Sequence, residues 1–406
     1  MSLFNSACFA VWPRTKRLTV AVLAATTVAG CSTTLTSWTD ALPKIPAPSF
    51  GWLFGKSNKP GPLPTLTAKV TPQLNWQVSV GKAAAGLAPA ITPSAVFAAA
   101  NDGTLVRVDA ATGRQVWRIN VGQKISAGPG ADDSHVVVGT DKGDVLAFDA
   151  DGKPTWTAHV SSEVIAPPRV DEGVAIVFSG DGRIYGLSSA DGKTKWVHQR
   201  NNPALTIRNT AGGVTSRGGV FAGTAGGHLL ALDVSTGNVG WDATVASPKG
   251  ATELERIADI TSLPFIDERQ VCAVAYQGRV ACFDVVRGIL LWSRDLSSLS
   301  GLAGDEKNLY VTDDKGAVHA LDKTSGASVW KQDALAERRV GGPQLVGNFV
   351  GAVDTEGYLH LLARADGAYV GRLATDGRPP TAQPVVMAGS GLWLSDAGTL
   401  YSVTAR

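Results

Sequence analysis

Apolar and polar residues alternate over short runs through most of this chain, and glycine-containing turns separate the runs. In residues 125–160, for example, the four runs ISAGPGA, SHVVVGT, VLAFDA and PTWTAHV follow one another, with the turns DKGD and DG among their connections. Alternation with a period of two is typical of β-strands, and the spacing of an amphipathic helix is absent. The pattern therefore predicts an all-β protein.

A motif of about forty residues recurs along the chain. It consists of a turn glycine, an apolar strand, a second turn glycine and a tryptophan. The copies end at Trp117, Trp156, Trp196, Trp241, Trp292 and Trp330, and in the next copy Gly371 takes the tryptophan position. The C-terminal AGTLYSVTAR begins an eighth copy, and QLNWQVSV around Trp76 has the missing tryptophan strand.

Four strands in each unit of about forty residues are typical of a β-propeller blade. We therefore expect residues 69–406 to form an eight-bladed β-propeller of four-stranded blades. The N-terminal strand should close the ring, because an open end would leave unpaired backbone groups at a sheet edge. The tryptophans should pack between blades and bind no ligand.

The N-terminus has the layout of a lipoprotein signal. Residues 1–30 contain three basic residues and then the apolar run LTVAVLAATTVAG, and Cys31 completes the sequence VAGC, which resembles a bacterial lipobox. This resemblance implies cleavage before Cys31 and attachment of acyl chains such as palmitate, which would hold the protein in a membrane. Ser32 stands where an aspartate would retain such a protein in the inner membrane, so the periplasmic side of the outer membrane is the implied location. Residues 31–68 are rich in Pro, Gly, Ser and Thr, and we expect a flexible tether.

Charge and composition exclude several classes of function. The chain has 37 Lys and Arg against 35 Asp and Glu, and it contains no basic run and no phosphate-binding glycine loop, which disfavours nucleic acid and nucleotide partners. His319 and His360 occupy equivalent positions in neighbouring units, but no third ligand has a recognisable spacing, so we expect no metal site. No catalytic motif is present, and we expect no cofactor.

Cys272 and Cys282 lie in the predicted hairpin VCAVAYQGRVACF. A two-residue loop at Gln277 and Gly278 would place the cysteines on opposite faces, whereas a three-residue bulged loop centred on Gln277 would place them directly opposite each other. We favour the first register and expect two buried, unpaired thiols.

The repeat is longer at two neighbouring positions. Tryptophan spacing rises from 39 and 40 residues to 45 before Trp241 and 51 before Trp292. The extra residues are HQRNNPALTIRNTAGG and ATVASPKGATELERIADITSLP, each between an outer strand and the next inner strand. Such connections lie on one face of a propeller, where repeat proteins commonly bind partners.

The tryptophan repeat resembles the repeat of pyrroloquinoline quinone (PQQ) enzymes, although this chain has no adjacent cysteine pair of the kind found beside their cofactor. The lipobox, the tether, the eight units, the ALTIR and TELERIAD segments and DTEGYLHLL together resemble the BamB family over essentially the whole chain. BamB proteins are lipoprotein propellers of the β-barrel assembly (BAM) machinery of the outer membrane.

The BamB resemblance implies a non-catalytic scaffold that binds the periplasmic POTRA domains of BamA. It also implies association with other BAM subunits and help in the assembly and insertion of outer-membrane β-barrel proteins, whose unfolded chains could be contacted directly. The implied BamA contacts are Leu205, Ile207, Arg208 and Asp259, while Thr261 replaces a second family aspartate.

Three alternatives remain open at this stage. In the first, Leu205 and Ile207 pack under their own loop, and Arg208 pairs internally with an acidic residue such as Asp259. In the second, the chain is a PQQ-dependent dehydrogenase relative with a calcium site in its channel. In the third, it is a general peptide- or glycan-binding propeller lipoprotein.

Overall fold

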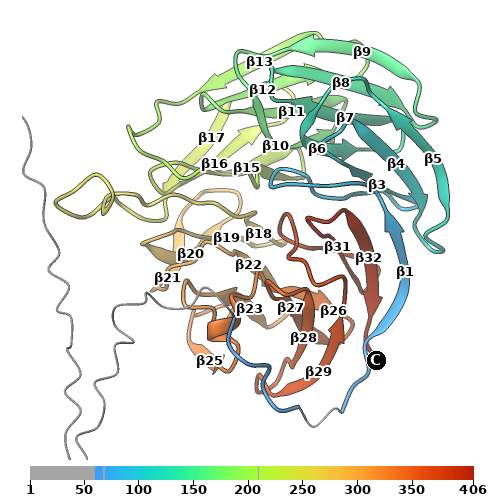
Figure 1. The fold of residues 1–406 in the computed structure, drawn as a ribbon. Coiled ribbons are helices and arrows are strands. Elements are labelled where there is room, and N and C mark those ends of the chain that lie inside the picture. Colours follow the sequence, from blue (N-terminus) through green and yellow to red (C-terminus); the bar gives the residue numbers. More distant parts are fainter. Residues whose placement is uncertain (1–59, 67–68, 209) are drawn as a thin grey trace, which may run out of the picture. The chain divides into compact units, whose positions relative to one another are not determined.

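The structure is a computed structural model, and it describes residues 60–66, 69–208 and 210–406. The predicted signal peptide, Cys31 and most of the predicted tether lie outside the described residues. The described residues form one compact unit, in which eight four-stranded antiparallel sheets follow one another around a ring (Figure 1). This arrangement confirms the predicted eight-bladed propeller.

Each of blades 1 to 7 uses four consecutive strands. Blades 1 to 4 consist of β2 (Ala90–Ile91), β3 (Ala95–Ala99), β4 (Thr104–Asp109) and β5 (Gln115–Asn120); β6 (Ile125–Ala131), β7 (His135–Thr140), β8 (Asp144–Asp149) and β9 (Pro154–His159); β10 (Val164–Asp171), β11 (Val174–Ser179), β12 (Arg183–Ser188) and β13 (Thr194–Gln199); and β14 (Gly213–Ser216), β15 (Gly219–Thr224), β16 (His228–Asp233) and β17 (Val239–Thr244).

Blades 5 to 8 consist of β18 (Phe265–Ile266), β19 (Gln270–Val274), β20 (Arg279–Asp284) and β21 (Leu290–Asp295); β22 (Leu302–Gly304), β23 (Asn308–Thr312), β24 (Val318–Asp322) and β25 (Ser328–Gln332); β26 (Gln344–Val346), β27 (Phe349–Val353), β28 (Tyr358–Ala363) and β29 (Tyr369–Ala374); and β30 (Val385–Met387), β31 (Ser390–Leu394), β32 (Thr399–Thr404) and β1 (Gln73–Ser79). A short 3-10 helix, η2 (Ala336–Arg338), precedes β26.

The N-terminal strand closes the ring, as the sequence predicted. β1 pairs with β32 from Gln73 opposite Thr404 to Ser79 opposite Thr399, so both ends of the propeller chain belong to blade 8. In every blade the first strand faces the channel and the fourth lies at the rim, except that β1 is the rim strand of blade 8. The middle strands are buried on both faces, because blades stack face to face; β3 and β31, for example, are buried throughout.

Seven tryptophans join neighbouring blades. Each donates its Nε1–H to a turn carbonyl of the next blade, with distances between 2.6 and 3.2 Å; the donors are Trp76, Trp117, Trp156, Trp196, Trp241, Trp292 and Trp330. The second turn glycine of the next blade lies directly against the indole ring of the tryptophan. At Gly326, where φ is +71°, an added Cβ would lie 2.4 Å from Cε3 of Trp292. The glycine and the tryptophan of the repeat therefore form one contact across each of these seven junctions.

Blade 7 has Gly371 in the tryptophan position, and the chain that precedes β1 occupies the vacant place. The backbone amides of Lys69 and Val70 both donate to the carbonyl oxygen of Val370, at 3.0 and 3.1 Å. A Cβ at Gly371 would lie 2.8 Å from the Val70 carbonyl oxygen, so this segment excludes a tryptophan there. We call residues 60–66 and 69–70 the N-terminal strap.

The first part of the strap contacts blade 7 and the segment before it, although the sequence placed residues 60–66 in a flexible tether. The Gly61 amide donates to the Glu337 carbonyl oxygen at 3.0 Å, and the Arg338 guanidinium donates to the Gly61 carbonyl oxygen. Arg372 reaches the Pro64 carbonyl oxygen at 3.4 Å. A tether remains our prediction only for residues 31–59.

The expectation of two free thiols is wrong. Cys272 and Cys282 form a disulfide, and their Cα atoms lie 4.0 Å apart. They are directly paired in the ladder between β19 and β20, and the Ala275 amide donates to the Arg279 carbonyl oxygen across the turn. The turn therefore has the three-residue bulged register, with Gln277 at φ +49°. Within the described part of the chain, no helix is long and apolar enough to cross a membrane.

Candidate functional site

The two insertions predicted from the tryptophan spacing lie next to each other. The first joins β13 to β14, and the second joins β17 to β18. Each connects the rim strand of one blade to the channel strand of the next, so both open on the same face of the ring. We call residues 200–208 and 210–212 the first insertion, and residues 245–264 the second insertion.

Asp259 of the second insertion holds the first insertion in place. Its carboxylate accepts a hydrogen bond from the Ile207 amide at 2.5 Å through Oδ2, and another from the Gly226 amide at 2.8 Å through Oδ1. The Asp259 carbonyl oxygen accepts from the Tyr276 amide at 2.9 Å. Only 1% of Asp259 is exposed. In this arrangement Asp259 orients the loop from beneath and does not reach the surface itself.

Arg208 pairs with a residue that the sequence analysis did not single out. Nη1 and Nη2 of Arg208 donate to Oε1 and Oε2 of Glu163 at 2.8 and 2.9 Å, which is a forked, two-bond ion pair. Glu163 directly precedes β10, far from Arg208 in sequence. Arg208 thus pairs internally with an acidic residue, as one alternative expected, but the partner is Glu163. It is not Asp259, whose carboxylate accepts backbone amides.

The apolar residues of the insertions differ in exposure. Leu205 is 44% exposed, whereas Ile207 is half-buried, so the two do not form one fully exposed apolar face. Leu254, in the second insertion, is 68% exposed, and the sequence analysis did not single it out. The one feature of the sequence that could have indicated an exposed Leu254 is its place as the single apolar residue in the segment TELER. Glu255 beside it accepts the amides of Ala251 and Thr252, which fixes this turn.

Thr261 takes no part in holding the first insertion. Its Oγ1 donates to the Leu299 carbonyl oxygen at 3.4 Å, and thus toward blade 6. The carboxylate of Asp259 accepts hydrogen bonds from both the Ile207 and the Gly226 amides. Among the described residues, no second acidic residue of the second insertion contacts these amides.

A pocket of about 300 Å³ lies beside the first insertion, between blades 3 and 4. Ile207, Arg208 and Asp259 line one side of it, and Phe178 and Ile184 from blade 3 provide apolar lining. The structure thus brings together three of the four residues singled out from the sequence, while Leu205 lies outside this pocket.

The two equivalent histidines have the same kind of partner. His319 Nε2 lies 2.9 Å from Asp313 Oδ2, and His360 Nε2 lies 2.7 Å from Asp354 Oδ2. Each aspartate lies at the turn before the strand that carries its histidine. Among the described residues, no group of three or more His, Cys, Asp and Glu could hold a metal ion.

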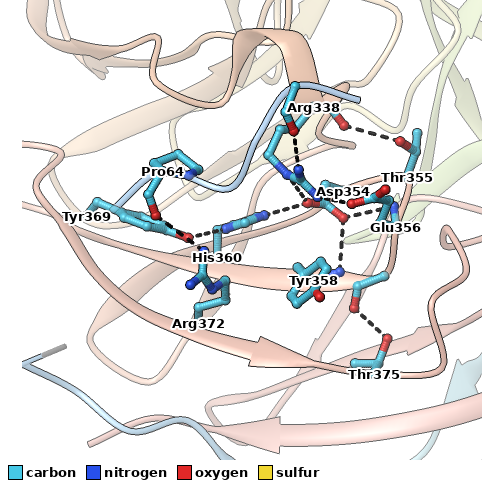
Figure 2. Close-up of polar contacts among 12 residues, drawn as sticks. Pro64, Arg338, Asp354, Thr355, Glu356, Tyr358, His360, Tyr369, Arg372 and Thr375 are labelled. Atoms are coloured by element: carbon cyan, nitrogen blue, oxygen red, sulfur yellow. Dashed lines mark hydrogen bonds and ion pairs between the residues drawn. The ribbon is translucent and has the colours of Figure 1, made fainter. Parts of the chain in front are cut away.

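His360 belongs to a buried polar chain that also fixes the N-terminal strap (Figure 2). Arg338 donates through Nε to Asp354 Oδ2 at 2.7 Å, and it also contacts Glu356. Tyr369 lies within hydrogen-bonding distance of His360 Nδ1. A neutral His360 with its proton on Nε2 satisfies both neighbours, because it donates to Asp354 and accepts from Tyr369. Burial lowers the pKa of His360 and outweighs the opposite effect of Asp354.

The fold and the repeat define the class of this protein as a PQQ-type β-propeller. Quinohemoprotein alcohol dehydrogenase from Comamonas testosteroni has the same fold, with a TM-score of 0.62 at 14% identity over 82% of this chain and 76% of that chain. At this identity the likeness concerns the fold alone.

More specific comparisons identify the family. The profile described as "Outer membrane protein assembly factor BamB" matches residues 101–332. Proteins of that name from Bordetella pertussis and Nitrosomonas eutropha are 40% and 44% identical, over 86% and 74% of this chain and 91% and 74% of their own lengths. The crystal structure of BamB from Moraxella catarrhalis superposes with a TM-score of 0.75 at 25% identity, over 82% of this chain and 99% of that one. The chain belongs to the BamB family.

Proposed function

We propose that this chain is a non-catalytic assembly factor of the BAM complex that binds the periplasmic POTRA region of BamA and assists the assembly and insertion of outer-membrane β-barrel proteins. Membership of the BamB family, with relatives that match over most of the chain, carries this proposal. Other BAM subunits and unfolded outer-membrane proteins are further partners on this account.

The proposed BamA-binding surface is formed by the two insertions. Leu205 and Leu254 supply exposed apolar side chains, and Arg208 supplies a planar cation whose side chain is 56% exposed. Clusters of apolar residues and arginine are typical of binding hot spots. An exposed ion pair such as that between Arg208 and Glu163 contributes only about 0–1 kcal/mol, so Arg208 can exchange Glu163 for a partner carboxylate at little cost.

Asp259 has a different role in this proposal. Its carboxylate is buried beneath the first insertion and accepts the Ile207 amide. We assign it to positioning the loop that carries Leu205 and Arg208. A loop that is already ordered loses less conformational entropy on binding, which favours affinity.

The proposed location is the periplasmic side of the outer membrane, with acyl chains on Cys31 as the anchor. The lipobox VAGC supports the lipid anchor, and Ser32 supports the outer membrane, because an aspartate at this position would retain the protein in the inner membrane. The names of the relatives agree with an outer-membrane function. The anchor would keep the propeller close to other membrane-bound subunits, which raises its effective concentration.

The residues of the channel mouth do not fit a calcium-dependent quinone cofactor. Such a site needs carboxylates for the metal ion. A pocket at the ring axis is lined by residues of seven blades, among them Arg169 and Gln383, and none of its described lining residues is Asp or Glu. We therefore derive no reaction through that cofactor.

A pull-down from native envelopes tests the proposal. The combined Leu205→Ala, Ile207→Ala and Arg208→Ala variant should lose BamA while its unfolding midpoint changes little. A matched control is the combined Arg287→Ala, Leu290→Ala and Leu291→Ala variant, which also removes one arginine and two large apolar side chains, here from the blade 5 rim. Retention of BamA by a folded first variant, or equal loss in both variants, would rule out this site.

A further inference from the structure

A second pocket lies at the mouth of the central channel. It has a volume of about 220 Å³, and its lining comes from the channel strands of seven blades or from the residues just before them. Residues of seven blades can meet only at the ring axis, which places this pocket in the channel. Because Thr210 and Thr261 belong to the lining, the pocket opens on the face that carries the two insertions.

Arg169 of β10 is the one charged residue among the described residues that line this pocket. Its Nε donates to the Gly213 carbonyl oxygen at 2.7 Å, which fixes the plane of the guanidinium group. Within the described part of the chain, no carboxylate pairs with its Nη1 and Nη2 atoms. Burial lowers the pKa of Arg169, and no acidic neighbour opposes this effect.

Some arginines of the propeller have acidic partners, whereas others, such as Arg107 and Arg279, donate to backbone carbonyl oxygens as Arg169 does. Arg183, Arg200 and Arg378 pair with Asp181, Asp242 and Asp396. Arg169 is half-buried, so its guanidinium group has lost part of its hydration without gaining a counter-ion, and an anion that enters with good geometry offsets this cost. Arg169 is therefore preorganised for an anion that the described chain itself does not supply.

The remaining lining indicates which anion would fit. A single positive charge matches a monoanion, and the planar fork of Nη1 and Nη2 matches the two oxygens of a carboxylate. Leu263, Leu299 and Val385 contribute apolar lining beside it. The volume is below the range of about 300–1,000 Å³ typical of drug-sized ligands, so a group the size of one amino-acid residue fits best.

Two polar groups at the pocket border are unpaired. Ser262 Oγ and Gln383 Oε1 are buried without a hydrogen-bond partner in the described part of the chain. Gln383 is held through its Nε2, which donates to the Leu302 carbonyl oxygen at 2.7 Å. Gln383 Oε1 has almost no surface open to the pocket, so this group does not decide which ligand is bound.

We propose that the channel mouth binds a carboxylate attached to a small apolar group, with Nη1 and Nη2 of Arg169 as the donors. A free acylated amino acid and the C-terminal residue of a peptide share this chemistry. The proposed donor, Arg169 of β10, lies outside the insertions that form the proposed BamA-binding surface, although the insertions contribute Thr210, Thr261 and Leu263 to the lining. Binding of a carboxylate to Arg169 does not depend on the function proposed above.

The test uses the full-length protein in mild detergent and calorimetric titration with N-acetyl-leucine, with the tripeptide N-acetyl-Ala-Ala-Leu, and with the C-terminal amide of each. Both acids should bind at least about tenfold more tightly than their amides, because the amide removes the charge-assisted bonds. Equal affinity of the two acids would indicate a site for small free carboxylates. A peptide acid that binds more than tenfold better would indicate a site for peptide C-termini.

Variants locate the binding. Arg169→Gln should abolish the preference for the acid, whereas Arg169→Lys should keep part of it, since it retains the charge but loses the fork. Lys195→Gln, which removes an exposed charge from the same blade, is the matched control and should bind like the parent. Nitrogen NMR of the Arg169 guanidinium in the unaltered protein gives a readout that does not depend on variant folding, and its Nε–H signal should shift with the acid only.

Three results would overturn this proposal: no binding of either acid at about 10 mM, a concentration well above a 1 mM dissociation constant; equal binding of acid and amide; or an Arg169 signal that does not respond to the acid.

Discussion

Substitution of Asp259 by Asn tests the role that the structure gives to this residue. Asn has nearly the same shape, but it replaces one carboxylate oxygen by an NH₂ group. Either the Ile207 amide or the Gly226 amide must then face a donor, because each now donates to a different oxygen of Asp259. The variant therefore removes one acceptor without creating a cavity.

The expected magnitude follows from the burial of these groups. A hydrogen bond to a charged group contributes about 1.5–3 kcal/mol, and a buried donor without an acceptor costs about 1–3 kcal/mol. Part of this cost disappears when the loop opens to water, since Ile207 is only half-buried. We expect the first insertion to open more easily by about 3 kcal/mol, which corresponds to roughly a hundredfold.

Amide hydrogen exchange measures this opening directly. The Ile207 amide should exchange about a hundredfold faster in Asp259→Asn, while the amide of Val220 in β15 should keep its rate. Glu163→Gln is the matched control, because it breaks the exposed ion pair of Arg208 and leaves the Ile207 amide with its acceptor. Unchanged rates of both the Ile207 and the Gly226 amides in Asp259→Asn would show that the carboxylate does not hold the loop.

Three further predictions concern blades 5 and 7. Arg338→Met should lower the free energy of unfolding by about 3 kcal/mol or more, measured by denaturant titration, because Asp354 is fully buried and would lose its cation. Since the pKa of His360 is lowered from 6.5, the unfolded chain takes up a proton before the folded one, so stability should fall below pH 6.5 by at most about 1.4 kcal/mol per pH unit. This slope should be smaller in His360→Gln, and an equal slope would contradict the assignment. Replacement of Cys272 and Cys282 by Ser should cost about 2–3 kcal/mol for a loop of sequence separation 10, and an unchanged unfolding midpoint would count against a bridge that stabilises the fold.

The propeller was predictable because its signals are local and repeated. Alternating runs, turn glycines and one tryptophan per unit each depend on neighbouring residues, and Trp76 supplied the missing strand of the eighth unit. The repeat also showed where it is interrupted, which located the two insertions.

The features that the sequence did not predict depend on contacts between distant segments. The partner of Arg208 is Glu163 from another blade connection, and no pattern in the sequence links the two. The strap on blade 7 belongs to a segment whose composition is that of a tether, and its backbone amides bind Val370 because Gly371 leaves space there. In the hairpin, one residue of turn register decided between two thiols and a disulfide.

Photo-crosslinking from position 205 in native envelopes tests the central claim most directly. A photoreactive residue replaces Leu205 in the first insertion, and the same residue replaces Leu291 on the blade 5 rim as the control; the two leucines have similar exposure, 44% and 49%. Our account predicts a crosslink to BamA from position 205 and none from position 291. Absence of that crosslink from position 205, or equal crosslinks from both positions, would contradict it.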